Sequence, residues 1–343
     1  MISYGSEENR SQIFSNNINT YNGHTIGIWA SYADITNNLI NGSSGGSWAI
    51  GHGNSNVITG NTITNMSYGI QVDGQSDNVI DGNSIQVSNT GINGNNANNL
   101  TVTNNTIQTD GGTVIYTNNG ISNIKYNLLI SNSGRGIHCE NQAGEEFSHN
   151  TIIGNGGDYG IHISNLSQPI VNSNIIVGFQ NGIYDENDLQ NNQIRFNDLY
   201  NISNEAYSGT GLPVMIGNYV NEIATMSGDS VLADIYGNMN ANPQFAMPDE
   251  GNYELQLISP CINNGDPSIL DPDGTGSDIG AFYKDASIVE DVYGCMDETA
   301  CNYNAGATLV NGDCTTATTW YWDEDGDGLG FIESTEVSCD QPI

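Results

Sequence analysis

Two histidines and two glutamates in the middle of the chain have residue types suited to acid–base chemistry. His138 and Glu140 lie two positions apart, and His162 and Glu186 follow them. Imidazole and carboxyl groups are common proton donors and acceptors in catalysis, and their pKa values shift readily with their surroundings. Arg135 is the nearest cation. These five residues form the candidate catalytic set of a polysaccharide hydrolase or lyase.

A second set of side chains suits the binding of sugars. Aromatic rings stack on the apolar faces of pyranoses, while amides and carboxylates bond to hydroxyl groups. The alternative is an ordinary solvated sheet face, since isolated surface aromatics need no special explanation. The candidate ligand-binding residues are Trp29, Gln71, Asp73, Asn93, Tyr116 and Tyr184.

Both sets are positioned by a repeat with a period of 22 to 24 residues. Two independent markers at one such period indicate a solenoid. The first marker is an asparagine two positions before Ile or Leu, at Asn16, Asn38, Asn61, Asn83, Asn105, Asn127, Asn150, Asn174 and Asn197. The second is an isoleucine, at Ile28, Ile50, Ile70, Ile92, Ile115, Ile137, Ile161 and Ile183.

Within each repeat, apolar and polar residues alternate, which indicates short half-buried strands separated by turns. The pattern predicts an all-β, right-handed parallel β-helix over residues 1–205, with about nine rungs of 22–24 residues. A rung is one turn of the coil, and neighbouring rungs are about 4.8 Å apart. We expect the recurring asparagines to stack at a bend and bond to one another through their amides.

The alternation also predicts which side chains point outward. If each marker isoleucine points inward, the next residue and the third one face solvent. His138 and His162 then lie about 5 Å apart on adjacent rungs, with Glu140 close to both. The repeat at Trp48 has an ambiguous offset, and either choice leaves Ala49 and Gly51 outward.

The repeats resemble those of the pectate lyase-like superfamily over about 200 residues, for example at Asn61-Thr62-Ile63 and Asn105-Thr106-Ile107. That superfamily includes lyases, hydrolases, epimerases, adhesins and phage tailspikes, so the resemblance implies a fold rather than one activity. In the resembling enzymes the substrate lies along such a sheet. Uronate lyases of the pectate type use Arg or Lys with calcium. Only Lys125, Arg135 and Arg195 are cations on the eight complete rungs, which argues against that activity.

After the repeats, residues 206–285 are predicted to cap the solenoid, since the last rung would otherwise expose its core and backbone. This segment resembles the terminal segment of secreted bacterial β-helix proteins. Its Asp266, Asp271, Asp273 and Asp278 either shape turns or bind calcium.

Residues 286–314 resemble a cysteine module of secreted and surface proteins of marine Bacteroidetes-type bacteria. The resemblance implies a Cys295–Cys314 disulfide and leaves Cys301 for Cys339. A zinc site is the alternative, but the spacing gives no closely spaced cysteine pair.

Residues 315–343 are an Asp-rich stub similar to thrombospondin type 3 repeats. Its Asp323, Asp325 and Asp327 alternate before Gly328, as in calcium loops. Calcium is therefore the expected cofactor. The Asp-rich stub ends without the further repeats usual for such loops, and the repeat pattern places the first residues inside a repeat, so a fragment of a longer protein is expected.

The composition restricts the classes of molecule that the protein can bind. Five Lys and Arg against 39 Asp and Glu give a net charge of −34, which repels nucleic acids and anionic membranes. No apolar run is long enough for membrane insertion, and the crowded C-terminal cysteines indicate an oxidising compartment. We expect an extracellular or bacterial cell-surface protein that binds a polysaccharide or cell-surface glycan, or acts as an adhesin. An enzyme acting on the same face and a structural spacer are the alternatives.

Overall fold

The computed structural model describes residues 1–20, 26–42, 47–51, 53–141, 143–187, 193–285, 293–303, 309–310, 314–323, 330, 332 and 335–339. The chain separates into two compact units, Met1–Lys284 and Asp285–Ile343. Within the described residues the one helix is a short 3₁₀ turn, η1 (Pro248–Glu250). No described helix is long and apolar enough to cross a lipid bilayer.

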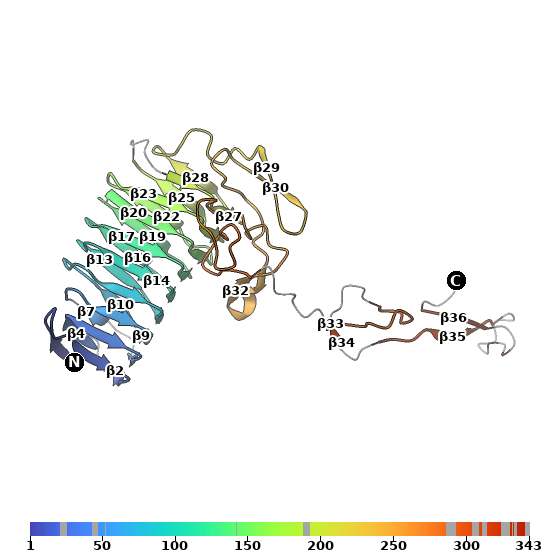
Figure 1. Ribbon diagram of the computed structural model, residues 1–343, viewed down its shortest axis with the longest axis horizontal. Helices are drawn as coiled ribbons and strands as arrows, with labels where there is room; N and C mark the ends of the chain where they lie inside the picture. The colour runs from blue at the N-terminus through green and yellow to red at the C-terminus, as the bar shows by residue number, and fades with distance from the viewer. Residues whose placement is uncertain are drawn as a thin grey trace. The chain divides into compact units, whose positions relative to one another are not determined.

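The first unit is the predicted right-handed parallel β-helix, in which three parallel sheets run along the coil (Figure 1). Sheet A contains β1 (Ile2–Tyr4), β4 (Ile28–Ser31), β7 (Trp48–Gly51), β10 (Tyr68–Gln71), β13 (Ile92–Asn95), β16 (Thr113–Asn118), β19 (Arg135–Glu140), β22 (Tyr159–Ser164), β25 (Asn181–Asp185) and β28 (Glu205–Gly209). Sheet B contains β2 (Ser11–Phe14), β5 (Ala33–Thr36), β8 (Val57–Thr59), β11 (Val79–Asp81), β14 (Leu100–Thr103), β17 (Ser122–Lys125), β20 (Ala143–Ser148), β23 (Gln168–Asn172) and β26 (Gln193–Arg195). Sheet C contains β3 (Asn17–Asn19), β6 (Leu39–Asn41), β9 (Thr62–Met66), β12 (Ser84–Val87), β15 (Thr106–Thr109), β18 (Leu128–Ser131), β21 (Thr151–Gly154), β24 (Ile175–Val177) and β27 (Asp198–Tyr200).

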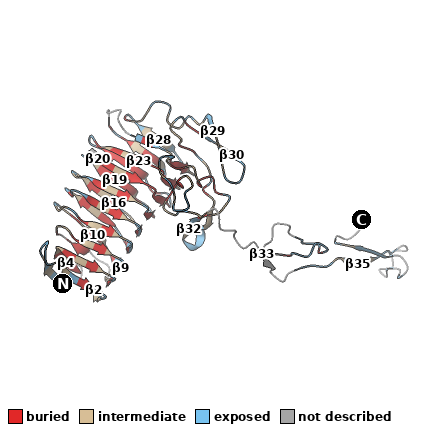
Figure 2. Cartoon of the chain, in the orientation of Figure 1, coloured by how far each residue is buried: buried red, intermediate tan, exposed pale blue. Residues whose placement is uncertain are grey.

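Many residues of the coil's strands are buried (Figure 2), and the interior is a column of stacked isoleucines. The marker isoleucines pair in register from rung to rung, for example Ile92 with Ile115 and Ile137 with Ile161, and all are buried. Matching β-branched side chains at each level fill the interior while the backbone forms parallel ladders between rungs.

The recurring asparagines form the predicted ladder at the bend between sheets B and C. The side-chain Nδ2 of Asn105 donates to Oδ1 of Asn127 at 3.0 Å, and the same contact repeats from Asn16 to Asn197. The residue before each ladder asparagine is left-handed, for example Tyr126 with φ 57° and His149 with φ 52°. This bend leaves backbone groups without ladder partners, and the buried amides satisfy them.

The interior also contains polar groups at the corner between sheets A and B. The carboxyl group of Glu145 is fully buried, and its Oε1 accepts from the hydroxyl of Ser122 at 3.1 Å. The Cys139 thiol and Thr117 on sheet A are buried as well. Burial raises the pKa of Glu145 to about 8 and raises the pKa of Cys139 well above its ordinary value.

The C-terminal part of the first unit first extends the coil and then forms structure that is not part of the coil. Asn238 extends the asparagine ladder by accepting from Asn197 at 3.0 Å, and its own amide donates to the carboxylate of Asp234 at 3.1 Å. Four further strands form two hairpins. In the first, β29 (Asn221–Ala224) pairs with β30 (Ser230–Ala233), and in the second, β31 (Phe245–Met247) pairs with β32 (Asn252–Leu255). A second buried cluster around Met239 and Ile262 covers Ile175.

The segment after β32 lies along the repeat body. Asn172 donates to Oδ2 of Asp266 at 2.7 Å, and the backbone amide of Ala281 donates to the Thr151 hydroxyl at 3.0 Å. Asp273 accepts from the backbone amide of Thr275, two residues on, as turn-shaping aspartates do, whereas Asp278 accepts from the more distant backbone amides of Asn263 and Lys284.

The second unit contains two disulfides, Cys295–Cys314 and Cys301–Cys339. The remaining cysteines, Cys139 and Cys261, are free and buried in the first unit. The short strands are β33 (Tyr293–Gly294) with β34 (Leu309–Val310), and β35 (Thr318–Tyr321) with β36 (Thr335–Ser338). Both disulfides have the pairing that the cysteine-module resemblance implies, and they indicate an oxidising, extracellular environment.

Candidate functional site

The candidate residues lie in two register rows on the outer face of sheet A. In the first row, Gln71 pairs with Asn93, Tyr116 with His138, and His162 with Tyr184. Trp29 belongs to the same row through its pairing with Gly51, which pairs with Gln71. In the second row, Asn118 pairs with Glu140, and Glu140 pairs with Ser164. The period-two prediction therefore gives the correct neighbours along the coil.

The structure brings the five candidate catalytic residues together as one His–Glu cluster: Arg135, His138, Glu140, His162 and Glu186. The two imidazole rings stack with centroids 4.3 Å apart and planes 5° apart. Nε2 of His138 lies 3.3 Å from Oε1 of Glu140, and Nε2 of His162 lies 2.7 Å from Oε1 of Glu186. Each histidine therefore has its own carboxylate on the second row.

Hydrogen-bond chemistry fixes the tautomers of the two rings. Nη1 of Arg135 lies 3.1 Å from Nδ1 of His138, and a guanidinium can only donate, so Nδ1 of His138 is the acceptor. The proton of His138 is then on Nε2, which faces Glu140 and the hydroxyl of Ser164 at 3.2 Å. The carboxylate of Glu186 can only accept, so Nε2 of His162 carries the proton and donates it. Nδ1 of His162 is buried without a hydrogen-bond partner.

Burial keeps both imidazoles neutral. His138 is 7% exposed and His162 6% exposed, although both are on the outer face, because they cover one another. Desolvation, followed by His162 and Arg135, lowers the pKa of His138 to about 3. Desolvation also lowers the pKa of His162, against the opposing effect of Glu186. At neutral pH both rings are hydrogen-bond donors and acceptors rather than cations.

Tyrosines surround the cluster. The Tyr116 hydroxyl donates to Oε2 of Glu140 at 2.9 Å, and burial together with Glu140 raises the pKa of Tyr116 to about 12. Tyr159 stacks on Tyr184 at 5.0 Å between centroids. The guanidinium of Arg135 lies 5.7 Å from the centroid of the Tyr159 ring, within cation–π range. Four rungs thus present aromatic rings, imidazoles and carboxylates on one continuous surface.

The N-terminal half of the face differs from the sequence expectation at one rung. Ala49 is fully buried and not outward, because β7 begins at Trp48 and Trp48 takes the outer position. Trp48 pairs in register with Tyr68, and their rings stack at 4.7 Å between centroids. Sequence reasoning missed this pair and Tyr159, which lie two positions before the marker isoleucines. An aromatic residue recurring there was the available signal.

Asp73 and its neighbours form a largely half-buried ladder beside the first row. Asn95 donates to Oδ1 of Asp73 at 2.7 Å, Asn118 donates to Asn95 at 3.0 Å, and Asn141 donates to Asn118 at 3.1 Å. Each amide accepts from one rung and donates to the other, so the aspartate terminates the ladder as a pure acceptor.

The calcium prediction is only partly within the described residues. Asp323 is described and exposed, whereas Asp325 and Asp327 lie outside the described residues. Among the side chains that the structure does describe, no three His, Cys, Asp or Glu are placed to hold a metal ion together.

The comparison with protein families supports the fold. Residues 49–199 match the family model described as "Right handed beta helix region". A solved structure described as "Crystal structure of Agl-KA catalytic domain" matches with a TM-score of 0.42 and 16% identity, over 60% of this chain. This chain spans about half of that structure's length, 48%. No curated protein matches the sequence significantly.

Proposed function

We propose that this chain is an extracellular carbohydrate-binding β-helix that recognises a polysaccharide or cell-surface glycan through the outer face of sheet A. The observation that carries the proposal is the continuous surface of Tyr116, His138, His162, Tyr159 and Tyr184, whose rings lie 4.3 to 5.4 Å apart. Rings, neutral imidazoles and carboxylates at this density provide both the apolar contacts and the hydrogen bonds that sugars require.

The hydrogen bonding within the His–Glu cluster favours binding over catalysis. Glu140 accepts from Tyr116 and contacts His138, while Glu186 contacts His162. Such mutual bonds fix the side chains in one arrangement, which lowers the entropy lost when a ligand binds. An adhesin on a bacterial cell surface is consistent with this role, as are the disulfide-bonded tail and the net charge of −34.

A polysaccharide hydrolase is the second candidate, and one observation favours it. Glu140 pairs with Ser164 on the next rung, and Glu186 follows β25 one rung further on. Two rungs separate the two carboxylates by about 9.6 Å along the coil, close to the spacing of roughly 6.5–9.5 Å in inverting glycosidases. A general acid and a general base flanking one glycosidic bond would need such a spacing.

A glycan array in calcium-containing buffer, followed by product analysis on every bound glycan, separates the candidates. Binding without cleavage supports the carbohydrate-binding proposal, and Tyr184→Ala should weaken that binding about tenfold because it removes a stacking surface. Shortened or unsaturated products would replace the binding role by an enzymatic one. A protein that bound no glycan would instead be a structural spacer.

A further inference from the structure

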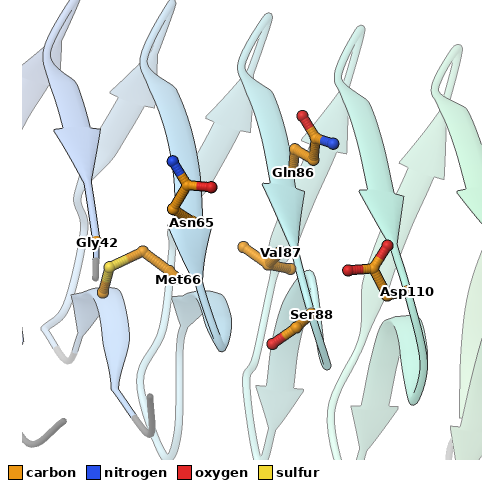
Figure 3. A pocket seen from close by; sticks show the side chains of 7 residues that line it. All are labelled: Gly42, Asn65, Met66, Gln86, Val87, Ser88 and Asp110. Carbon is orange, nitrogen blue, oxygen red and sulfur yellow. The ribbon is translucent and has the colours of Figure 1, made fainter. Parts of the chain in front are cut away.

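A pocket lies at the corner between sheets C and A, on the N-terminal half of the coil. Its volume is about 390 Å³, and Figure 3 shows the side chains that line it. The lining residues are Gly42, Asn65, Met66, Gln86, Val87, Ser88 and Asp110. None of them belongs to the His–Glu cluster or to the candidate sugar-binding rows.

An extra residue in β9 shapes this corner. The register of β9 with β12 shifts so that Gln86 pairs with Thr64 but Val87 pairs with Met66. The additional residue, Asn65, has φ 56°. Bulges of this kind re-aim side chains and are frequent beside functional sites.

Glycine is required at the opposite wall. A Cβ on Gly42 would lie 2.4 Å from both the Asn65 carbonyl oxygen and the Met66 sulfur. Any larger residue would therefore displace the bulge or Met66. The hollow thus depends on two local features of the sequence, the inserted Asn65 and the glycine facing it.

The pocket has an apolar floor and a polar rim. Met66 and Val87 are 4% and 3% exposed, whereas Asn65, Gln86, Ser88 and Asp110 are exposed. The rim provides two amides, a hydroxyl and one carboxylate, and no cation is among the described residues that line it. Oδ1 of Asp110 accepts from the Asn132 amide at 3.1 Å. Closely spaced donors and acceptors over an apolar floor match a neutral sugar ring, while the uncompensated carboxylate disfavours uronates and sulfated sugars.

The stacked pair Trp48–Tyr68 adjoins the pocket along the chain. Tyr68 follows Met66 by two residues, which places their Cα atoms within about 7 Å. The backbone amide of Ser88 donates to the Met66 carbonyl at 3.0 Å, and Asn89 donates to the Tyr68 hydroxyl at 3.4 Å. The pocket wall therefore continues directly into the aromatic residues of sheet A.

We propose that this pocket is a second carbohydrate-binding site, which takes one neutral pyranose unit and has the Trp48–Tyr68 pair beside it. The inference rests on the proposed carbohydrate-binding function for the class of its ligand, but the residues of the pocket are not those of sheet A. The pocket would hold a side branch or chain end of a glycan whose main chain lies along sheet A.

Met66 provides a direct probe, because it lines the pocket and is only 4% exposed. The full chain is labelled with ¹³C-methyl methionine, and the Met66 signal is assigned from the Met66→Leu variant. Cellotetraose, laminaritetraose, xylotetraose and mannotetraose are the neutral probes, tetragalacturonate is the anionic probe and a glucosamine tetramer is the cationic probe. We expect the Met66 signal to shift with at least one neutral oligosaccharide and with neither charged one.

Substitutions in the rim of the pocket test which side chains bind the oligosaccharide. Gln86→Ala and Asp110→Asn should each weaken binding of that oligosaccharide at least fivefold. Gln108→Ala is the matched control for the amide, because Gln108 pairs in register with Gln86 on the next rung and does not line the pocket. Asp81→Asn on sheet B is the control for the carboxylate. Both controls should bind like the unchanged chain.

The outcomes for the pocket and for sheet A are distinct. Binding that Tyr116→Ala abolishes, with an unmoved Met66 signal, would overturn the pocket and leave the sheet A function standing. A Met66 shift that survives Tyr116→Ala supports the pocket as a binding site separate from sheet A. A Met66 signal that moves only with the charged oligomers, or with none of the probes, would overturn the inference.

Discussion

His138 and His162 stack face to face on adjacent rungs, with ring centroids 4.3 Å apart and planes 5° apart. Two protonated imidazoles at this distance would repel strongly, and both are already desolvated. The geometry therefore belongs to two neutral rings. It provides a flat, polarisable surface in which Nε2–H of His138 bonds to the Ser164 hydroxyl, close to Glu140, and Nε2–H of His162 bonds to Glu186.

The first prediction concerns acid stability. The folded-state pKa of His138 is about 3, against 6.5 when unfolded. Above pH 6.5, His138 is unprotonated in both the folded and the unfolded state, and its contribution to the free energy of unfolding is fully present. As the pH falls towards 3, only the unfolded state gains the proton, so the free energy of unfolding falls by about 1.4 kcal/mol per pH unit for this group. Urea unfolding at several pH values measures the slope.

The matching variant is His138→Phe, which keeps a flat ring and removes the titration. Its free energy of unfolding should depend less steeply on pH between 4 and 6 than that of the unchanged chain. A slope identical in both proteins would contradict the neutral assignment. Imidazole ¹⁵N spectra give an independent check, with a proton expected on Nε2 of His138 and none on Nδ1 at pH 6.

The second prediction concerns Glu145, whose carboxyl group lies inside the coil. Its folded-state pKa is about 8, raised from 4.5 by burial, so folding favours the protonated form. Stability from this group is fully present below pH 4.5 and is lost as the pH rises towards 8. Glu145→Gln should therefore stabilise the protein at pH 8 by about 4 kcal/mol.

At pH 4 the same substitution should have little effect, because Gln keeps the acceptor for Ser122 and resembles the protonated acid. Glu222→Gln, on the exposed strand β29, is the control and should change neither value appreciably. If Glu145→Gln destabilised the protein equally at both pH values, the buried carboxyl would be ionised in the folded state.

The repeat positions were predictable because one side-chain period and one coil period determine them together. Asn105 and Ile115 recur in every neighbouring rung, and the stacked structure requires equivalent residues to meet. His138 and His162 could be placed side by side for the same reason. Register in a parallel coil converts sequence spacing directly into distance.

Features that break the period could not be predicted. The corner pocket depends on the inserted residue Asn65. The burial of Glu145 follows from a register shift in β20. Each is a local backbone departure that costs little energy, so residue type and spacing do not specify it.

The third prediction concerns calcium in the C-terminal tail. Cys301 and Cys339 are 38 residues apart and form a disulfide, and the loop that they close contains Asp323, Asp325 and Asp327. A closed loop restricts the unliganded chain, so oxidised protein should bind calcium more tightly than reduced protein. Calorimetric titration of both forms measures the difference, and thermal melting with a chelator should lower the transition of the tail. If Asp325→Asn and the unchanged chain gave equal heats on titration with calcium, the prediction that this loop binds calcium would be wrong.

The last prediction concerns the asparagine ladder, in which inner and terminal positions should differ. The amide of Asn105 donates to Asn127, to the Ile80 carbonyl and to the Thr103 carbonyl, at 2.8 to 3.0 Å. Its Oδ1 accepts from the backbone and side chain of Asn83 at 2.9 Å. Asn105→Ala leaves several buried groups unpaired at once, and we expect a loss of about 4 kcal/mol in the free energy of unfolding.

Asn16 makes the equivalent contact with Asn38 but is only half-buried, so water can replace lost partners. Asn16→Ala should therefore cost about 1 kcal/mol or less. Hydrogen exchange gives the spatial readout, because Asn105→Ala should increase exchange at the amides of Asn83 and of residues on both adjacent rungs. A ladder of purely local importance would instead show equal costs at both positions, and exchange would rise only at the substituted rung.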